Sequence, residues 1–233
     1  MPLMRRKRFY RRKRYSRRPT RIGGFLTPTA RSRFNPTKWI DSGNATGPCT
    51  IGGYGLTAVW PLYVPLNICT QGSAMTQRIG TKVIMKSLSI RGKVTHGNAQ
   101  GDYLFMRALL VYDRQANNSA TPATLSEILD ASSTIGRLNL SNTARFLIVK
   151  DWQWVHGNSN TASNASYKYF NKYVKLPNLS TLYNSGNAGT LADIASGSLV
   201  FYIFSDVASN GNTPPTNTDC PYFSGFFRLR FLD

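Results

Sequence analysis

The residues best suited to chemistry are a run of cations at the start of the chain. Segment 1–33 contains eleven arginines, two lysines and no acidic residue, a charge of +13. A guanidinium offers paired N–H donors to phosphate, and its plane can stack on bases. Two tyrosines lie inside the run, and stacking on unpaired bases suits a single strand better than a duplex. The predicted nucleic-acid-binding residues are Arg5, Arg6, Lys7, Arg8, Tyr10, Arg11, Arg12, Lys13, Arg14, Tyr15, Arg17, Arg18, Arg21, Arg31 and Arg33.

This arm has almost nothing apolar to bury, so self-repulsion and chain entropy both oppose folding without a polyanion. A basic run can also serve as a nuclear import signal, a role compatible with nucleic-acid binding. A mitochondrial transit peptide is disfavoured because positions 1–21 lack the apolar face of an amphipathic helix. A secretory signal is not expected because no apolar core segment follows the charges. We therefore predict that the arm binds nucleic acid.

Groups for catalysis or metal binding are scarce. The chain has two histidines, His96 and His156, and a single glutamate, Glu127, without the spacing of a metal site or a catalytic triad. The three cysteines have no C-x-x-C spacing, which argues against a zinc site or a disulfide scaffold. No phosphate-binding loop motif occurs. We therefore expect neither an enzyme nor a cofactor or metal, although sparse acids alone do not exclude enzymatic activity.

The rest of the chain must present this arm. Residues 34–233 hold 16 basic and 10 acidic groups, so the body is only mildly basic at +6. Scarce glutamate with many β-branched and aromatic residues favours a β-rich domain, and no apolar run reaches membrane-spanning length. We expect an arm at 1–33, a Gly/Pro/Thr hinge at 34–54 in which Trp39 docks on its own domain or on a neighbour, and a β-rich domain at 55–233.

Alternating apolar and polar residues predict the strands of that domain. One short helix is expected at 124–130, where Thr124 and Glu127 form a capping box. Leu191–Ala195 fits a short helix or a strand, and long polar loops are expected at 115–123, 157–166 and 207–221. About eight strands and one helix add up to an antiparallel sandwich. The expected strands are 56–66, weakened by two prolines, and 82–94, 102–112, 146–155, 167–174, 198–205 and 222–232.

The last strand, 222–232, has one apolar face, and Arg228 and Arg230 lie on the other face. If the sandwich is a jelly roll, this strand is expected beside the first one, which is predicted at 56–66.

Two stretches carry a resemblance to a known family. Gln77–Lys82 followed by Lys86–Gly92 is similar to the first core strand of capsid proteins from circular, Rep-encoding single-stranded DNA viruses, the circovirus-like group. Arg107–Gln115, with the helix at 124–130, fits that group's next strand and its connection. Coat proteins of small satellite RNA viruses share a similar plan, so a single-stranded RNA genome is the alternative.

The resemblance implies a single jelly roll of two four-stranded sheets, with 55–233 as the shell domain. It also implies self-assembly of sixty copies into a T = 1 shell, with the arm inside holding a single-stranded genome, DNA rather than RNA. Arg228 and Arg230 are then candidates to face the lumen of the shell, where they would supplement the arm. The alternative is that they pair with acids of a neighbouring subunit.

Expected partners are other copies of the chain, a host nuclear import receptor, and a host attachment factor reached through surface loops, with no membrane. The protein is then expected in the virion and, during assembly, in the host nucleus. A cellular nucleic-acid-binding module is a further alternative, but it should carry its charge on the folded domain.

Overall fold

The computed structural model describes residues 37–42, 61–95, 103–157, 167–177, 179–184, 186–206 and 221–233. The predicted arm, 1–33, lies outside the described residues. Within them the chain forms ten strands, one α-helix and two short 3-10 helices, here called η2 and η3. The elements are β1 (Lys38–Ser42), β2 (Leu62–Pro65), β3 (Lys82–Thr95), β4 (Tyr103–Asp113), α1 (Leu125–Ile128), η2 (Leu140–Asn142), β5 (Phe146–Gly157), β6 (Tyr167–Lys175), β7 (Ser180–Tyr183), η3 (Leu191–Asp193), β8 (Ile194–Ser196), β9 (Ser198–Ser205) and β10 (Tyr222–Leu232).

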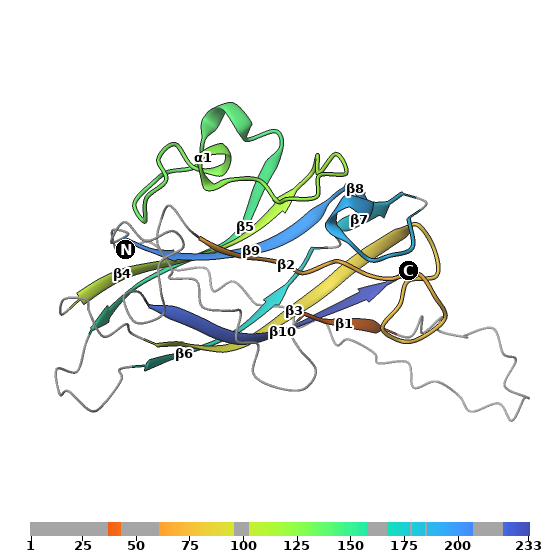
Figure 1. Cartoon of the computed structure of the whole chain (residues 1–233), viewed down its shortest axis with the longest axis horizontal. Coiled ribbons are helices and arrows are strands. Elements are labelled where there is room, and N and C mark those ends of the chain that lie inside the picture. Colours follow the sequence, from red (N-terminus) through yellow and green to blue (C-terminus); the bar gives the residue numbers. More distant parts are fainter. Residues whose placement is uncertain are drawn as a thin grey trace, which may run out of the picture. The chain divides into compact units, whose positions relative to one another are not determined.

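The described strands form two antiparallel sheets packed face to face (Figure 1). One sheet has the order β2-β9-β4-β5, and the other has the order β1-β10-β3-β7-β8. The long strand β3 also pairs with β6 along its second half. This strand order is that of a jelly roll, in which the last strand lies between the first strand and β3. The predicted fold class, an all-β jelly-roll sandwich with one short helix, is confirmed.

Inward-facing side chains of both sheets fill the space between them. On β10, Phe223, Phe227 and Phe231 are at most 2% exposed. The ring of Phe201, from the opposite sheet, lies 5.1 Å from that of Phe227. Each buried phenylalanine contributes about 1.5–3 kcal/mol of hydrophobic stabilisation. This aromatic core therefore holds the two sheets together.

The connection between β4 and β5 covers part of the outer side of the four-stranded sheet (Figure 1). Leu125 and Ile128 of α1 pack there against Leu109, Tyr202 and other buried residues, forming a second, smaller core. The capping box predicted for this helix is present, with the Thr124 backbone N–H donating to Glu127 Oε2 at 2.7 Å. The helix is one turn long, so its stability comes from this packing rather than from helix propensity.

The position of the first strand corrects the sequence analysis. Lys38–Ser42, inside the predicted hinge, forms β1, and β10 pairs with it rather than with the 56–66 segment. Of that segment only Leu62–Pro65 is a strand among the described residues, and it pairs with β9 in the other sheet. Trp39 is half-buried on its own domain. Five residues are too few to show a clear alternation, so the pattern of β1 was hidden among glycines and prolines.

One sheet has the expected four strands, and the other is larger, with six. Ser180–Tyr183 adds a short strand beside β3, and Ile194–Ser196 adds another beside β7. The first is too short to show a clear alternation. The segment 191–195, which fitted a short helix or a strand, contains both, as η3 is followed directly by β8. The strand predicted at 198–205 is confirmed as β9, and that at 222–232 as β10.

Candidate nucleic-acid interface

Of the predicted site residues, the structure describes only Arg228 and Arg230. Both lie on β10 with exposed side chains, on the face of the six-stranded sheet that points away from the core. Trp39 of β1 is opposite Arg230 on one side, and Ser87 of β3 is opposite it on the other. The fifteen predicted residues of the arm lie outside the described residues and stay a prediction.

Strand register brings further cations and aromatic rings to the same face. Ser87 is opposite Lys175 of β6, and Ser89 is opposite both Arg228 and Tyr173. Neighbouring strands lie about 4.8 Å apart, so these residues form rows across the sheet. We call this surface the basic sheet face, and its members are Arg91, Lys93, Lys175, Arg228, Arg230, Tyr167, Tyr169, Tyr173 and Phe226.

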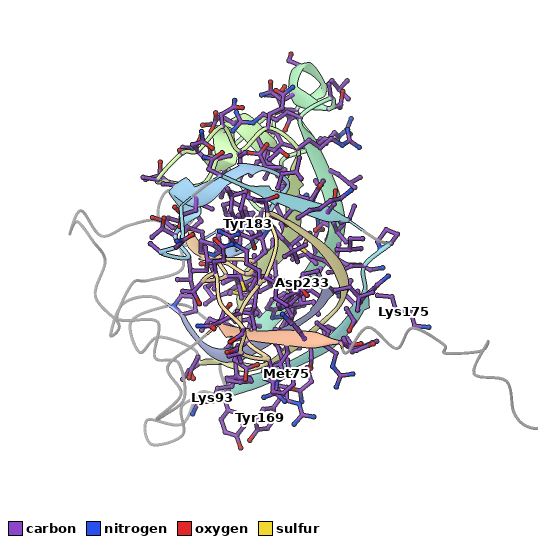
Figure 2. All side chains as sticks on the ribbon, turned by 90° about the vertical axis from the view of Figure 1, so that its right-hand side faces the viewer. Met75, Lys93, Tyr169, Lys175, Tyr183 and Asp233 are labelled. Carbon is purple, nitrogen blue, oxygen red and sulfur yellow. The ribbon has the colours of Figure 1, made fainter. Side chains whose placement is uncertain are left out.

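Two of these rows can be followed in the register, and one of them also in Figure 2. Phe226 is opposite Arg91, and Lys93 is opposite Tyr169. Figure 2 shows Lys93 and Tyr169 together at the lower end of the view, where the six-stranded sheet lies. The alternation of cation and ring across the strands places a phosphate partner beside a stacking partner.

The centre of the basic sheet face is hollowed. A groove of about 380 Å³ is lined by serines below and by arginines and rings at its sides. The serines on β3 are small, so the larger side chains of β6 and β10 stand above them as walls. The lining residues are Ser87, Ser89, Arg91, Tyr173, Phe226, Arg228 and Arg230.

One ion pair crosses this face. Arg228 binds the Asp41 carboxylate of β1 through both Nε and an Nη atom, at 2.7 and 2.8 Å. The hydrogen bond and the charge of Asp41 raise the pKa of Arg228 above its ordinary value. The Arg228 side chain is 45% exposed, so a phosphate can compete with Asp41 for the guanidinium. Within the chain, the acid that pairs with Arg228 is Asp41, and the alternative of pairing with acids of a neighbouring subunit stays a prediction.

Three tyrosines of β6 supply the aromatic part. Tyr167, Tyr169 and Tyr173 are 57%, 68% and 62% exposed. The first two rings meet edge to face with centroids 5.4 Å apart. Residues two apart on a strand lie about 7 Å apart on one face, so Tyr173 stands about two such steps from the Tyr167–Tyr169 pair. Exposed rings of this kind can stack on unpaired bases. Five cations against one carboxylate leave this face at +4.

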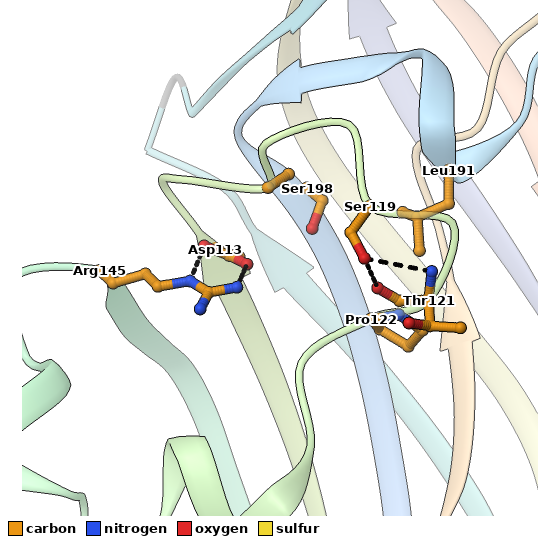
Figure 3. A pocket seen from close by; sticks show the side chains of 8 residues that line it. Asp113, Ser119, Thr121, Pro122, Arg145, Leu191 and Ser198 are labelled. Atoms are coloured by element: carbon orange, nitrogen blue, oxygen red, sulfur yellow. Dashed lines mark hydrogen bonds and ion pairs between the residues drawn. The ribbon is translucent and has the colours of Figure 1, made fainter.

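A second hollow lies where β4, β5 and the loop after β4 meet (Figure 3). Arg145 donates to both carboxylate oxygens of Asp113, at 3.1 and 2.9 Å, and to Glu127 at 3.3 Å. The bond to Asp113 raises the pKa of Arg145. The free volume is about 10 Å³, room for one water at most. We therefore interpret this cluster as a structural clamp on the β4–β5 connection.

The other candidate features of the sequence are metal ligands, a membrane span, cysteines and histidines. No cluster of three or more metal-ligating side chains occurs among them. None of the helices in this part of the chain has the length and apolar character needed to cross a membrane. Cys69 is buried, and burial raises the pKa of its thiol to about 11. Cys49, Cys220 and His96 lie outside the described residues, and His156 is buried in β5.

Sequence reasoning missed most of the basic sheet face. The alternation of tyrosines in 167–173 was visible, and so was the polar face that carries Arg91 and Lys93. The missing information was the register, which brings β10, β3 and β6 side by side although they are distant in sequence.

Comparisons with known proteins bear on this arrangement. The model of the family described as "Geminivirus coat protein/nuclear export factor BR1 family" matches residues 4–225. No curated protein matches the sequence. Among solved structures, the chain is similar to "Crystal structure of infectious bursal disease virus VP2 subviral particle", with 12% identity and a TM-score of 0.24. That match covers 77% of this chain and 32% of the other, so the chain spans about a third of its length. So low a TM-score adds nothing to the fold argument.

Proposed function

Because the chain belongs to the Geminivirus coat protein/nuclear export factor BR1 family, and is thus the capsid protein of a single-stranded DNA virus, we propose that it packages its genome through the arm at 1–33. A coat protein is a component of the virion and has a structural role. In our proposal sixty copies form a T = 1 shell, with the arms inside on single-stranded DNA. Family membership favours DNA over the RNA genome that the sequence left open.

The observation that carries this proposal is the segregation of charge. The first 33 residues hold +13 of the total +19, while the body from residue 34 keeps +6. Sixty such arms offer about 780 positive charges, enough to neutralise on the order of 700 phosphates. A charge concentrated in one segment suits a closed lumen filled with polyanion. A module that reads bases would need that charge on its folded surface.

We place the basic sheet face on the lumen side as well. Its cations and tyrosines are chemically matched to single strands, and the groove beside Arg228 and Arg230 is open to solvent. On this proposal the arm supplies most of the charge, and the sheet supplies a rigid surface on which unpaired bases can stack.

Deleting Met1–Arg21 tests the proposal because it removes +11 without touching a described strand. We expect particles that still form but lack nucleic acid, seen as a fall in A260/A280 of the purified particle peak. The matched control keeps the length of the arm and replaces every cation of 1–21 by glutamine, which should give the same loss. A second control replaces its arginines by lysines and should retain most of the load. Normal nucleic-acid content in the deleted particles would refute the role of the arm.

The arm is also proposed to direct nuclear import through two clusters, Arg5–Arg8 and Arg11–Arg14, that bind a host import receptor. A reporter fused to residues 1–21 should enter the nucleus, and the same fusion with both clusters changed to glutamine should stay in the cytoplasm. Cytoplasmic retention of the unchanged fusion would count against this role. Attachment to a host factor through surface loops belongs to the same proposal.

A further inference from the structure

The outer face of the four-stranded sheet carries an apolar cluster that packaging does not use. Phe105 of β4 is directly opposite Val155 of β5 in the register, and both point away from the core. Their exposed fractions are 55% and 48%, and Tyr103, two residues earlier on the same face of β4, is 74% exposed. Three large apolar side chains thus meet solvent at one corner of the sheet.

A fourth apolar side chain is held at this corner by a buried arginine. Arg107 follows Phe105 by two residues on the same face and is only 4% exposed. Its Nη1 donates to the backbone oxygens of Thr134 and Gly136 at 3.0 and 2.5 Å. Its Nε and Nη2 bind Asp151 at 3.1 and 2.8 Å. The turn between these two carbonyls presents Ile135, which is 85% exposed.

This arrangement fixes an exposed isoleucine in place. Two hydrogen bonds from the buried guanidinium hold the turn, and two more to Asp151 fix the guanidinium itself, so the Ile135 side chain is presented from a rigid backbone. A rigid apolar side chain loses little conformational entropy when a partner covers it. Single exposed apolar residues are ordinary, but a group of them beside a rigid turn is a feature of interaction surfaces.

We infer that this corner, made of Tyr103, Phe105, Ile135 and Val155, is a contact surface for a second copy of the chain. The inference rests on the proposed assembly into a shell. From their exposed fractions, these side chains present on the order of 400–600 Å². A stable interface covers about 800 Å² per partner, so the corner could form the apolar centre of one.

Nucleic acid does not fit this surface. Arg107 is the cation beside the four residues of this corner, and it is buried and already bound to Asp151 and two carbonyls. Phosphate would therefore meet apolar side chains, whereas the opposite outer face of the sandwich offers five exposed cations. In a particle built from coat proteins, the partner available to cover this surface is another copy of the same chain.

Two single substitutions test the inference in the full-length protein, Ile135→Asp and Phe105→Asp. Each places a charge in the proposed apolar contact, and we expect about a tenfold or greater loss of protein from the particle fraction at a fixed concentration. Particle formation is measured by size-exclusion chromatography with light scattering and by negative-stain microscopy. Unchanged melting temperature and circular dichroism would show that the subunit itself stays folded.

Leu140→Asp is the matched control. Leu140 lies in the same β4–β5 connection and is 82% exposed, but it belongs to η2 rather than to the turn held by Arg107. We expect this variant to assemble like the unchanged protein. Normal assembly of both test variants, or an equal loss in the control, would overturn the inference while leaving the capsid role intact. An unchanged protein that never forms particles would overturn the proposed assembly and this contact with it.

Discussion

At the scale of single residues, burial separates arginines that hold the fold from arginines that can meet a ligand. Arg78, within the segment that resembles circovirus-like capsid proteins, is fully buried. Its guanidinium donates to the carbonyl oxygens of Cys69, Gly80 and Gly186 at 3.3, 2.7 and 2.5 Å. It also lies 4.4 Å from the ring centroid of Tyr183. Residue type alone would count Arg78 among the phosphate contacts, but its buried position means that it stabilises the fold.

Asp233 supports a prediction about pH. Its carboxylate accepts hydrogen bonds from Lys38 Nζ at 2.9 Å and from the backbone N–H of Ile79 at 2.6 Å. The side chains of Asp233 and Lys38 are only 8% and 5% exposed. Burial raises the pKa of Asp233, but the bonds from Lys38 and Ile79 outweigh it, so the pKa lies below its ordinary value of 3.8. The pair fastens β1, the first described strand, to the end of β10.

We expect Asp233→Asn to lower the free energy of unfolding by about 1–3 kcal/mol at pH 7. A carboxylate whose pKa is lower in the folded state stabilises the protein above its unfolded pKa. That contribution is lost as the pH falls through the folded value. The difference between the two proteins should therefore shrink as the pH falls below 3.8 and through the lower folded pKa. Urea unfolding followed by tryptophan fluorescence at pH 7 and at pH 2.5 measures this difference.

The control for this prediction is Asp41→Asn, which breaks the exposed ion pair with Arg228. Because Arg228 is 45% exposed, this change should be smaller than that of Asp233→Asn at pH 7. Equal changes in the two variants, or a gap for Asp233→Asn that persists undiminished at pH 2.5, would contradict the assigned role of Asp233.

At the scale of elements, β10 serves two surfaces with alternate residues. Phe227 is 1% exposed and packs against Phe201 and Phe223 in the core. Its neighbour Phe226 points the other way, into the groove of the basic sheet face. Successive side chains of a strand face opposite sides of a sheet, so one strand can stabilise the domain and line a ligand surface together.

This alternation predicts separate effects for two adjacent substitutions. Phe227→Ala should lower the free energy of unfolding by about 3–5 kcal/mol because it leaves a cavity among packed rings. Phe226→Ala should cost far less stability but weaken binding of an oligodeoxythymidine single strand, since one stacking surface is lost, worth about 1–3 kcal/mol. Thermal melts and fluorescence anisotropy measure the two effects. Reversed results would mean that the faces of β10 are assigned the wrong way round.

Sequence patterns predicted the strands whose apolar residues form a long continuous or alternating run. The strand β9 is apolar along its length, and β10 alternates over eleven residues, so both were located with their bounds. The helix α1 was located by its capping box, which is a local signal. The strand β1 was missed because its partner, β10, lies almost two hundred residues away and pairing with it defines the strand. The basic sheet face was missed for the same reason, since its rows exist only once β3, β6 and β10 are aligned.

At the scale of the whole molecule, the two outer faces of the sandwich differ in chemistry. The six-stranded sheet presents five cations and three tyrosines, and the four-stranded sheet presents the apolar corner beside the β4–β5 connection. A shell subunit needs one surface toward its genome and others toward its neighbours. Two surfaces of different chemistry on one subunit are therefore compatible with the proposed role, in which the arm supplies most of the charge.

The same difference between the two sheets predicts how the affinity of the protein without its arm for a single strand depends on salt. In a protein lacking Met1–Arg21, each phosphate neutralised on a single strand contributes about −0.7 to the slope of log affinity against log salt. Changing both Arg228 and Arg230 to glutamine should therefore make the slope shallower by about 1.4. Lys150→Gln removes an exposed cation from the opposite sheet and should leave the slope unchanged. An equal effect of Lys150→Gln would mean that binding follows net charge alone, and that the basic sheet face is not a site.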